Sequence, residues 1–93
     1  MSSNAERRAA RAKVPAFHEE QLGRLVECLA DAIDRHRAEE LNAFEVDEVA
    51  FQYSRAAKEL WKFCNLGNVE IAARMIAADP PTDWWDRGAR RQR

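Results

Sequence analysis

The chain has 93 residues and a mass of 10.7 kDa, enough for one small domain but not for two independent cores. Hydrophobic residues make up 46% of the sequence, and three glycines with three prolines are too few for a turn-rich β-sandwich or barrel. The longest purely apolar run spans residues 75–78, which predicts neither a membrane-spanning helix nor a secretory signal. We therefore expect an all-α fold, a small three-helix bundle with a short fourth C-terminal helical turn and basic terminal arms.

The net charge of −1 conceals a segregated pattern. Residues 1–13 and 86–93 each hold four basic residues and one acidic residue, so the segment between them is acidic. Residues 1–13 lack a large apolar side chain that could anchor a helix, and we expect a flexible basic arm there. The predicted helical bundle covers residues 14–86, and a basic tail covers residues 87–93.

The first predicted helix spans residues 15–37. Pro15 suits a first helical turn, where its missing N–H removes no hydrogen bond. Gly23 lies inside this helix and costs about 1 kcal/mol relative to alanine, so we expect a neighbouring backbone to approach it closely. The predicted core face carries apolar residues at helical spacing, namely Leu22, Leu25, Val26, Leu29 and Ile33.

The second predicted helix spans residues 43–65. Asn42 and Glu45 have the spacing of a capping box, although a cap at Asp47 would shift the start by about one turn. Gly67 supplies a left-handed residue just past the helix end. The predicted core stripe consists of Val46, Val49, Ala50, Tyr53, Ala57, Leu60 and Cys64.

A third helix is predicted over residues 68–78, with Asn68 as its cap and the sequence Asp-Pro-Pro at residues 79–81 as its stop. Apolar side chains surround this segment almost completely, so we expect it to be the most buried element. After the prolines, residues 81–87 could form a further helical turn. Short connections of this kind favour antiparallel neighbours in a small bundle.

Residues that could support catalysis or metal binding are few. His18 and His36 are predicted at the two ends of the first helix, and no paired spacing of histidine, cysteine or glutamate ligands occurs. We therefore predict no catalytic residues, no metal and no cofactor, and a protein that is not an enzyme. Cys28 and Cys64 are too few for a small secreted disulfide scaffold, which favours a reducing, cytoplasmic compartment.

Two phenylalanines on the second helix suggest a binding surface. Phe44 and Phe51 are seven residues apart and project opposite the predicted core direction, among charged residues. Such a pair is typical of anchors for a protein partner or for a second copy of the chain. In the alternative interpretation, Phe44 folds inward and Trp84 or Trp85 covers Phe51. The predicted partner-binding residues are Phe44, Phe51, Arg55, Lys58 and Lys62.

A nucleic-acid-binding function is the competing hypothesis. The sequence Glu-Ile-Ala at residues 70–72, followed by a turn and residues 81–85, resembles a helix-turn-helix unit, which implies a recognition helix over residues 81–92. The resemblance departs from the pattern because two prolines lengthen the turn and no turn glycine is present. The tryptophans could stack on bases or simply cover one end of the bundle. The residues predicted to bind nucleic acid are Trp84, Arg87, Arg90, Arg91 and Arg93.

Overall fold

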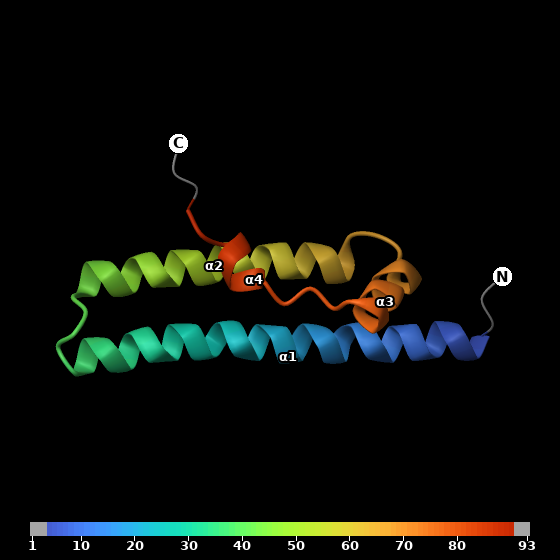
Figure 1. Cartoon of the computed structure of the whole chain (residues 1–93), viewed down its shortest axis with the longest axis horizontal. Helices are drawn as coiled ribbons and strands as arrows, with labels where there is room; N and C mark the ends of the chain where they lie inside the picture. The colour runs from blue at the N-terminus through green and yellow to red at the C-terminus, as the bar shows by residue number, and fades with distance from the viewer. Residues whose placement is uncertain (1–3, 91–93) are drawn as a thin grey trace.

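The computed structural model describes residues 4–90, which form four helices and contain no strand. Helix α1 (Asn4–Arg37) and helix α2 (Ala43–Asn65) form an antiparallel hairpin (Figure 1). Helix α3 (Val69–Ala78) lies across the N-terminal part of α1, and helix α4 (Trp84–Arg87) lies on α2. The predicted all-α bundle is confirmed.

The N-terminal part of α1 differs from the prediction. A flexible arm over residues 1–13 is wrong for residues 4–13, which are helical, while residues 1–3 lie outside the described residues. Ala10 is buried there, and it belongs to one cluster with Ala72 and Ala73 of α3. Because all three side chains are small, the two helices approach each other closely, and a large apolar anchor is not needed.

The core face of α1 also differs from the predicted stripe. Leu25 is buried as expected, but Val26 is 45% exposed and Ile33 is 37% exposed. Pro15 lies in the interior of the helix, so its predicted place in the first turn is wrong. The buried stripe runs along an adjacent face and consists of Ala10, Val14, Phe17, Gln21, Leu25 and Ala32.

Helix α2 begins and ends where the sequence predicts. The capping box is formed, since the Asn42 side chain accepts from the Glu45 backbone N–H at 2.8 Å and the Glu45 side chain accepts from the Asn42 N–H at 2.9 Å. These bonds satisfy two donors that a helix N-terminus otherwise leaves unpaired. Gly67 follows the helix with a φ of 148°, a value that side-chain-bearing residues rarely adopt.

Helix α3 has the predicted bounds but not the predicted burial. The Asn68 side chain accepts from the N–H groups of Glu70 and Ile71, as a cap should. However, Ile71 is 55% exposed and Met75 is 48% exposed, because α3 buries only the side that faces α1. The expectation that this helix is the most buried element is therefore wrong.

The core consists of two connected clusters. The larger cluster contains Phe17, Leu25, Ala56, Leu60 and Trp84, and the smaller one contains Ala10, Val14, Ala72 and Ala73. The Phe63 ring lies between two aromatic rings of the larger cluster, with its centroid 5.8 Å from that of Phe17 and 5.4 Å from that of Trp84. Phe63, Cys64 and Ile76 contact both clusters, so the core is continuous along the hairpin.

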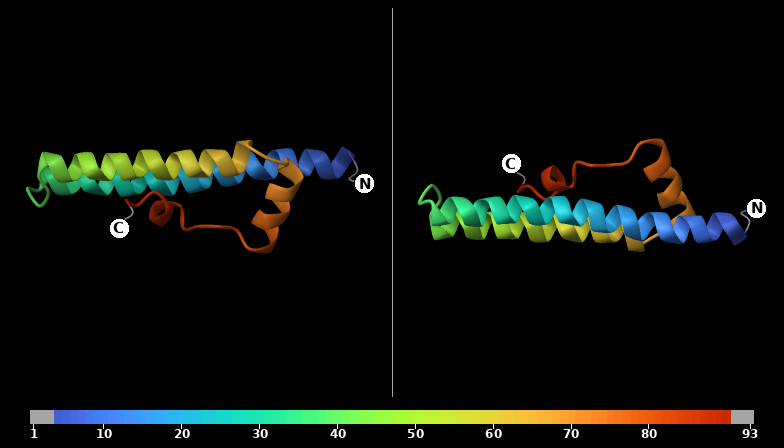
Figure 2. Two further views of the ribbon diagram at one scale, coloured as in Figure 1. Left: turned by 90° about the horizontal axis from the view of Figure 1, so that it is seen from above. Right: turned by 90° about the horizontal axis from the view of Figure 1, so that it is seen from below.

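The described residues that follow α2, up to residue 90, lie on one side of the hairpin. Figure 2 shows α3, the irregular segment 79–83 and α4 on the same side of α1 and α2, and no described element on the opposite side. We call these two sides the covered face and the open face. The described part has a radius of gyration of 16.2 Å, whereas a compact domain of this length would have about 12 Å. A 34-residue helix with one covering layer accounts for the elongated form.

Candidate interaction surfaces

The covered face holds α4 against α2 through a close backbone crossing. A Cβ atom added at Gly88 would lie 2.6 Å from the backbone N of Ala56 and 2.6 Å from the backbone O of Gln52. The Gln52 side chain donates to the Trp85 carbonyl at 3.0 Å, and the Arg55 Nε donates to the Gly88 carbonyl at 2.6 Å. The end of the described chain is therefore fixed on α2 by hydrogen bonds as well as by packing.

The glycine that permits a close approach is not the predicted one. At Gly23, no atom lies within 4 Å of an added Cβ, so the expected neighbouring backbone is absent from the described residues. Gly88 fulfils that role instead, because its missing Cβ is what allows the α2 backbone to come so near. The sequence gives little indication of this, since Gly88 falls in a segment without helical periodicity.

Trp84 forms the centre of the covered face. Its side chain is 2% exposed, and its indole N–H donates to the Pro81 carbonyl at 2.9 Å. The Arg87 guanidinium lies over the indole ring at 4.4 Å and pairs with the Asp83 carboxylate at 2.9 Å. This hydrogen bond lowers the pKa of Asp83 below its usual value. A tryptophan therefore covers the helices as expected, but Trp84 lies on the middle of the hairpin and not at one end of the bundle, and its burial leaves no open ring face for stacking on a base.

The predicted recognition helix is not formed. Helix α4 contains four residues and ends at Arg87, and the next residue already lies against α2. Arg90 is exposed and lines a hollow together with Phe51 and Arg55. Arg91 and Arg93 lie outside the described residues. A continuous helix over residues 81–92 is therefore wrong for the part of that range that the structure describes.

The phenylalanines of α2 form an exposed ridge. Phe44 is 82% exposed and Phe51 is 58% exposed, so Phe44 does not fold inward and neither tryptophan covers Phe51. Both project from the side of α2 that points away from α1, and Lys58 and Lys62 follow on the same side. We call this surface the Phe ridge, and it consists of Phe44, Phe51, Arg55, Lys58 and Lys62.

The open face carries a second apolar surface that the sequence analysis missed. Val26 and Ile33 of α1 are partly exposed there, and Trp61 of α2 is 50% exposed. The helical spacing of Val26 and Ile33 predicts core positions for both, which their exposure contradicts. The sequence does indicate this surface, because the apolar residues of α1 occupy two adjacent faces of the helix. The hairpin buries just one of these faces.

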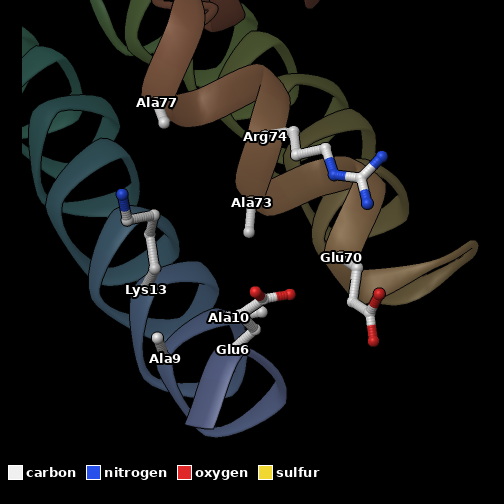
Figure 3. Close-up of a pocket in the computed structure, with 8 residues that line it drawn as sticks. All are labelled: Glu6, Ala9, Ala10, Lys13, Glu70, Ala73, Arg74 and Ala77. Atoms are coloured by element: carbon white, nitrogen blue, oxygen red, sulfur yellow. The ribbon is translucent and has the colours of Figure 1, made fainter. Parts of the chain in front are cut away.

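A groove also runs along the contact between the N-terminal part of α1 and α3 (Figure 3). Its volume is about 310 Å³, and its floor is formed by Ala9, Ala10, Ala73 and Ala77. Glu6, Lys13, Glu70 and Arg74 lie at its rim, and Arg7 lies 3.6 Å from the Glu70 carboxylate. Methyl groups on the floor and mixed charges at the rim provide neither a nucleophile nor a defined cluster of ligands.

The histidines and cysteines lie apart from one another in the described chain. His36 Nδ1 is 3.0 Å from the Leu41 carbonyl, so this ring holds the loop between α1 and α2. Cys28 and Cys64 are both free and half-buried, and burial raises the pKa of the Cys64 thiol. Within residues 4–90, no group of three or more histidine, cysteine, aspartate or glutamate side chains could hold a metal ion.

Comparisons with known proteins give no further assignment. No protein-family model matches the chain, and neither the curated proteins nor the solved structures contain a match. Among the described helices, none is long and apolar enough to span a bilayer.

Proposed function

We propose that the protein acts through protein–protein contacts and not through catalysis, with the Phe ridge as its binding surface. The observation that carries this proposal is the exposure of Phe44 and Phe51, at 82% and 58%, on a helix side that no other described element covers. A large apolar side chain that remains this exposed on an ordered helix loses the favourable free energy of burial. A ridge of two such residues on a charged surface is the usual form of a helix that binds a partner.

The ridge is rigid before any partner binds. The capping box fixes the first turn of α2, which carries Phe44, and the bond from Arg55 to the Gly88 carbonyl ties the middle of the helix to the covered face. Anchors that are already ordered lose less conformational entropy when they bind. Each phenylalanine could contribute about 1.5–3 kcal/mol on burial, before the general cost of association.

The charges on the ridge indicate the chemistry of the partner. Lys58 is exposed, and Lys62 forms a surface pair with Glu59 at 3.7 Å, a type of contact that stabilises little and exchanges readily. The C-terminal half of the ridge is therefore cationic, while the N-terminal half is aromatic. We infer a partner with an apolar groove that continues into an acidic edge.

Site-specific photo-cross-linking tests this function. A benzophenone amino acid replaces Phe51 in the cells that produce the protein, and the matched control places it at Asp34, which is exposed on α1. We expect a discrete protein adduct from position 51 that is lost when Lys62→Glu is added, because Lys62 belongs to the Phe ridge alone. The same adducts from both positions, or none from position 51, would contradict the proposal.

A further inference from the structure

The open face leaves an apolar surface along most of the hairpin. Val26, Ile33 and Trp61 are its exposed large side chains. At about 100° per residue, Leu22 and Leu29 lie on the same side of α1 as Val26 and Ile33, and Ala50 and Ala57 lie on the same side of α2 as Trp61. All four of these residues are half-buried, and Leu22 and Ala57 also pack against the larger core cluster.

The apolar stripe of α1 is symmetrical about its own midpoint. It reads Leu22, Val26, Leu29 and Ile33, so reversing the direction of the helix places Leu22 opposite Ile33 and Val26 opposite Leu29. Across a two-fold axis through this midpoint the two copies of the stripe lie antiparallel, and each contact between two of its residues occurs twice. The midpoint falls between residues 27 and 28.

The stripe of α2 has the same symmetry. Val46, Ala50, Ala57 and Trp61 place a large residue opposite a large one and alanine opposite alanine when the helix is reversed. Alanines facing each other allow two helix backbones to approach closely at the centre of an interface. The midpoint falls between residues 53 and 54.

These two midpoints lie at the same level of the hairpin. Phe17 and Phe63 face each other across it, with ring centroids 5.8 Å apart. The α1 midpoint lies about ten residues after Phe17 and the α2 midpoint about ten residues before Phe63, so they agree to within about one residue, or about 1.5 Å. One two-fold axis can therefore serve both helices.

Charges at the edges of the open face follow the same axis. Exposed Asp47 and Lys58 flank the α2 stripe, and reversal about its midpoint brings Asp47 of one copy near Lys58 of the other. Exposed Glu19 and Arg37 flank the α1 stripe in the same way, although Arg37 also lies 3.5 Å from Asp34 in the single chain. Opposite charges thus meet at both edges of the open face, and such complementarity favours this pairing of the two copies.

We propose that the open face binds a second copy of this chain. The two-fold axis runs across the helices in the plane of the interface, so that α1 lies antiparallel on α1 of the second copy and α2 lies antiparallel on its α2. The resulting core is a four-helix bundle.

The size of this interface follows from the dimensions of the helices. The distance from Glu19 to Arg37 is about 27 Å along the helix, and two helices side by side are about 20 Å wide, which gives on the order of 1,000 Å² of total buried surface. An area of this size lies at the low end for specific interfaces, so we expect a weak dimer whose population depends on concentration.

A charge exchange within one chain tests the proposal. Solution mass is measured by light scattering from about 1 µM to about 1 mM, a range that brackets the expected affinity. We expect the unmodified chain to form dimers as concentration rises, Asp47→Lys to weaken the dimer at least about tenfold through like-charge contact with Lys58, and Asp47→Lys with Lys58→Asp to restore it. Helical circular dichroism of each variant confirms that the monomer is folded.

A matched variant separates this inference from the proposed function. Phe51→Asp alters the Phe ridge and not the open face, so the dimer should persist with its affinity unchanged. If Phe51→Asp abolishes the dimer and Asp47→Lys does not, the second copy occupies the Phe ridge, and the open-face assignment is wrong while the proposed function stands. A chain that remains monomeric at every concentration also overturns the inference, and it leaves the photo-cross-linking result unaffected.

Discussion

The same two helices build both faces of the α1–α2 hairpin, but the described chain covers one face and leaves the other accessible to solvent. On the covered face, Ala56 is fully buried and the backbone of residue 88 lies directly against it. On the open face, the next residue, Ala57, is partly accessible and lies beside the half-exposed Trp61. Both faces are apolar, so apolar character alone does not decide which one the chain covers. A small chain with a single covering segment can bury one face, and the other is left for a different molecule.

The largest expected effect comes from removing the centre of the covered face. Trp84→Ala deletes a buried indole between Phe63 and Arg87 and should lower the free energy of unfolding by about 3–5 kcal/mol. Chemical denaturation at low protein concentration measures this change. The matched variant is Trp61→Ala on the open face, for which we expect less than about 1 kcal/mol, since half of that side chain is already in water. Equal losses in the two variants would remove the distinction between the faces.

Two glycine substitutions should have intermediate effects of opposite sign on the free energy of unfolding. Gly88→Ala forces a methyl group to within 2.6 Å of the α2 backbone, so α4 must move and the free energy of unfolding should fall by about 1–3 kcal/mol. Gly23→Ala meets no atom within 4 Å and should raise it by about 0.5–1 kcal/mol through helix propensity. Thermal unfolding of both variants tests the pair. A stabilising Gly88→Ala would show that the close crossing does not exist.

The smallest expected effect is on folding stability at acid pH, and it comes from Asp83 at the edge of the covered face. The hydrogen bond from Arg87 lowers the pKa of Asp83 in the folded state, so folding favours the ionised carboxylate. This contribution is complete above the ordinary pKa of aspartate and is lost as pH falls through the lowered value. Asp83→Asn should therefore flatten the acid side of the stability–pH curve slightly, as measured by thermal unfolding at a series of pH values. An unchanged curve would mean that the Asp83–Arg87 pair contributes nothing to stability.

The sequence predicts the parts of this fold that depend on local chemistry. The capping box at Asn42 and the cap at Asn68 place the starts of two helices, because the hydrogen bonds involved join residues two or three positions apart. The exposure of Phe44 and Phe51 could also be predicted, since both lie opposite the core stripe of their helix. Local spacing is sufficient for these features.

Features that depend on distant segments could not be predicted in this way. Residues 4–13 are helical because alanines of α3 meet Ala10, and nothing within the segment itself signals that contact. Gly88 approaches Ala56 across more than thirty positions of sequence, and Trp84 is buried by residues of both α1 and α2. The open face was missed for the same reason, because the assignment of Val26 and Ile33 to the core assumed a second layer that the described chain does not supply.

Phe63, Cys64 and Ile76 contact both core clusters, and this shared membership has a consequence for cooperativity. A local opening at Trp84 withdraws a neighbour from Phe63, and Phe63 in turn supports Ala72 and Ala73, which hold the first turns of α1. The N-terminal end of α1 and the middle of the hairpin are thereby coupled thermodynamically through these three side chains. Hydrogen exchange in the first turns of α1 should therefore respond to events at α4, even though Ala10 and Trp84 belong to different clusters.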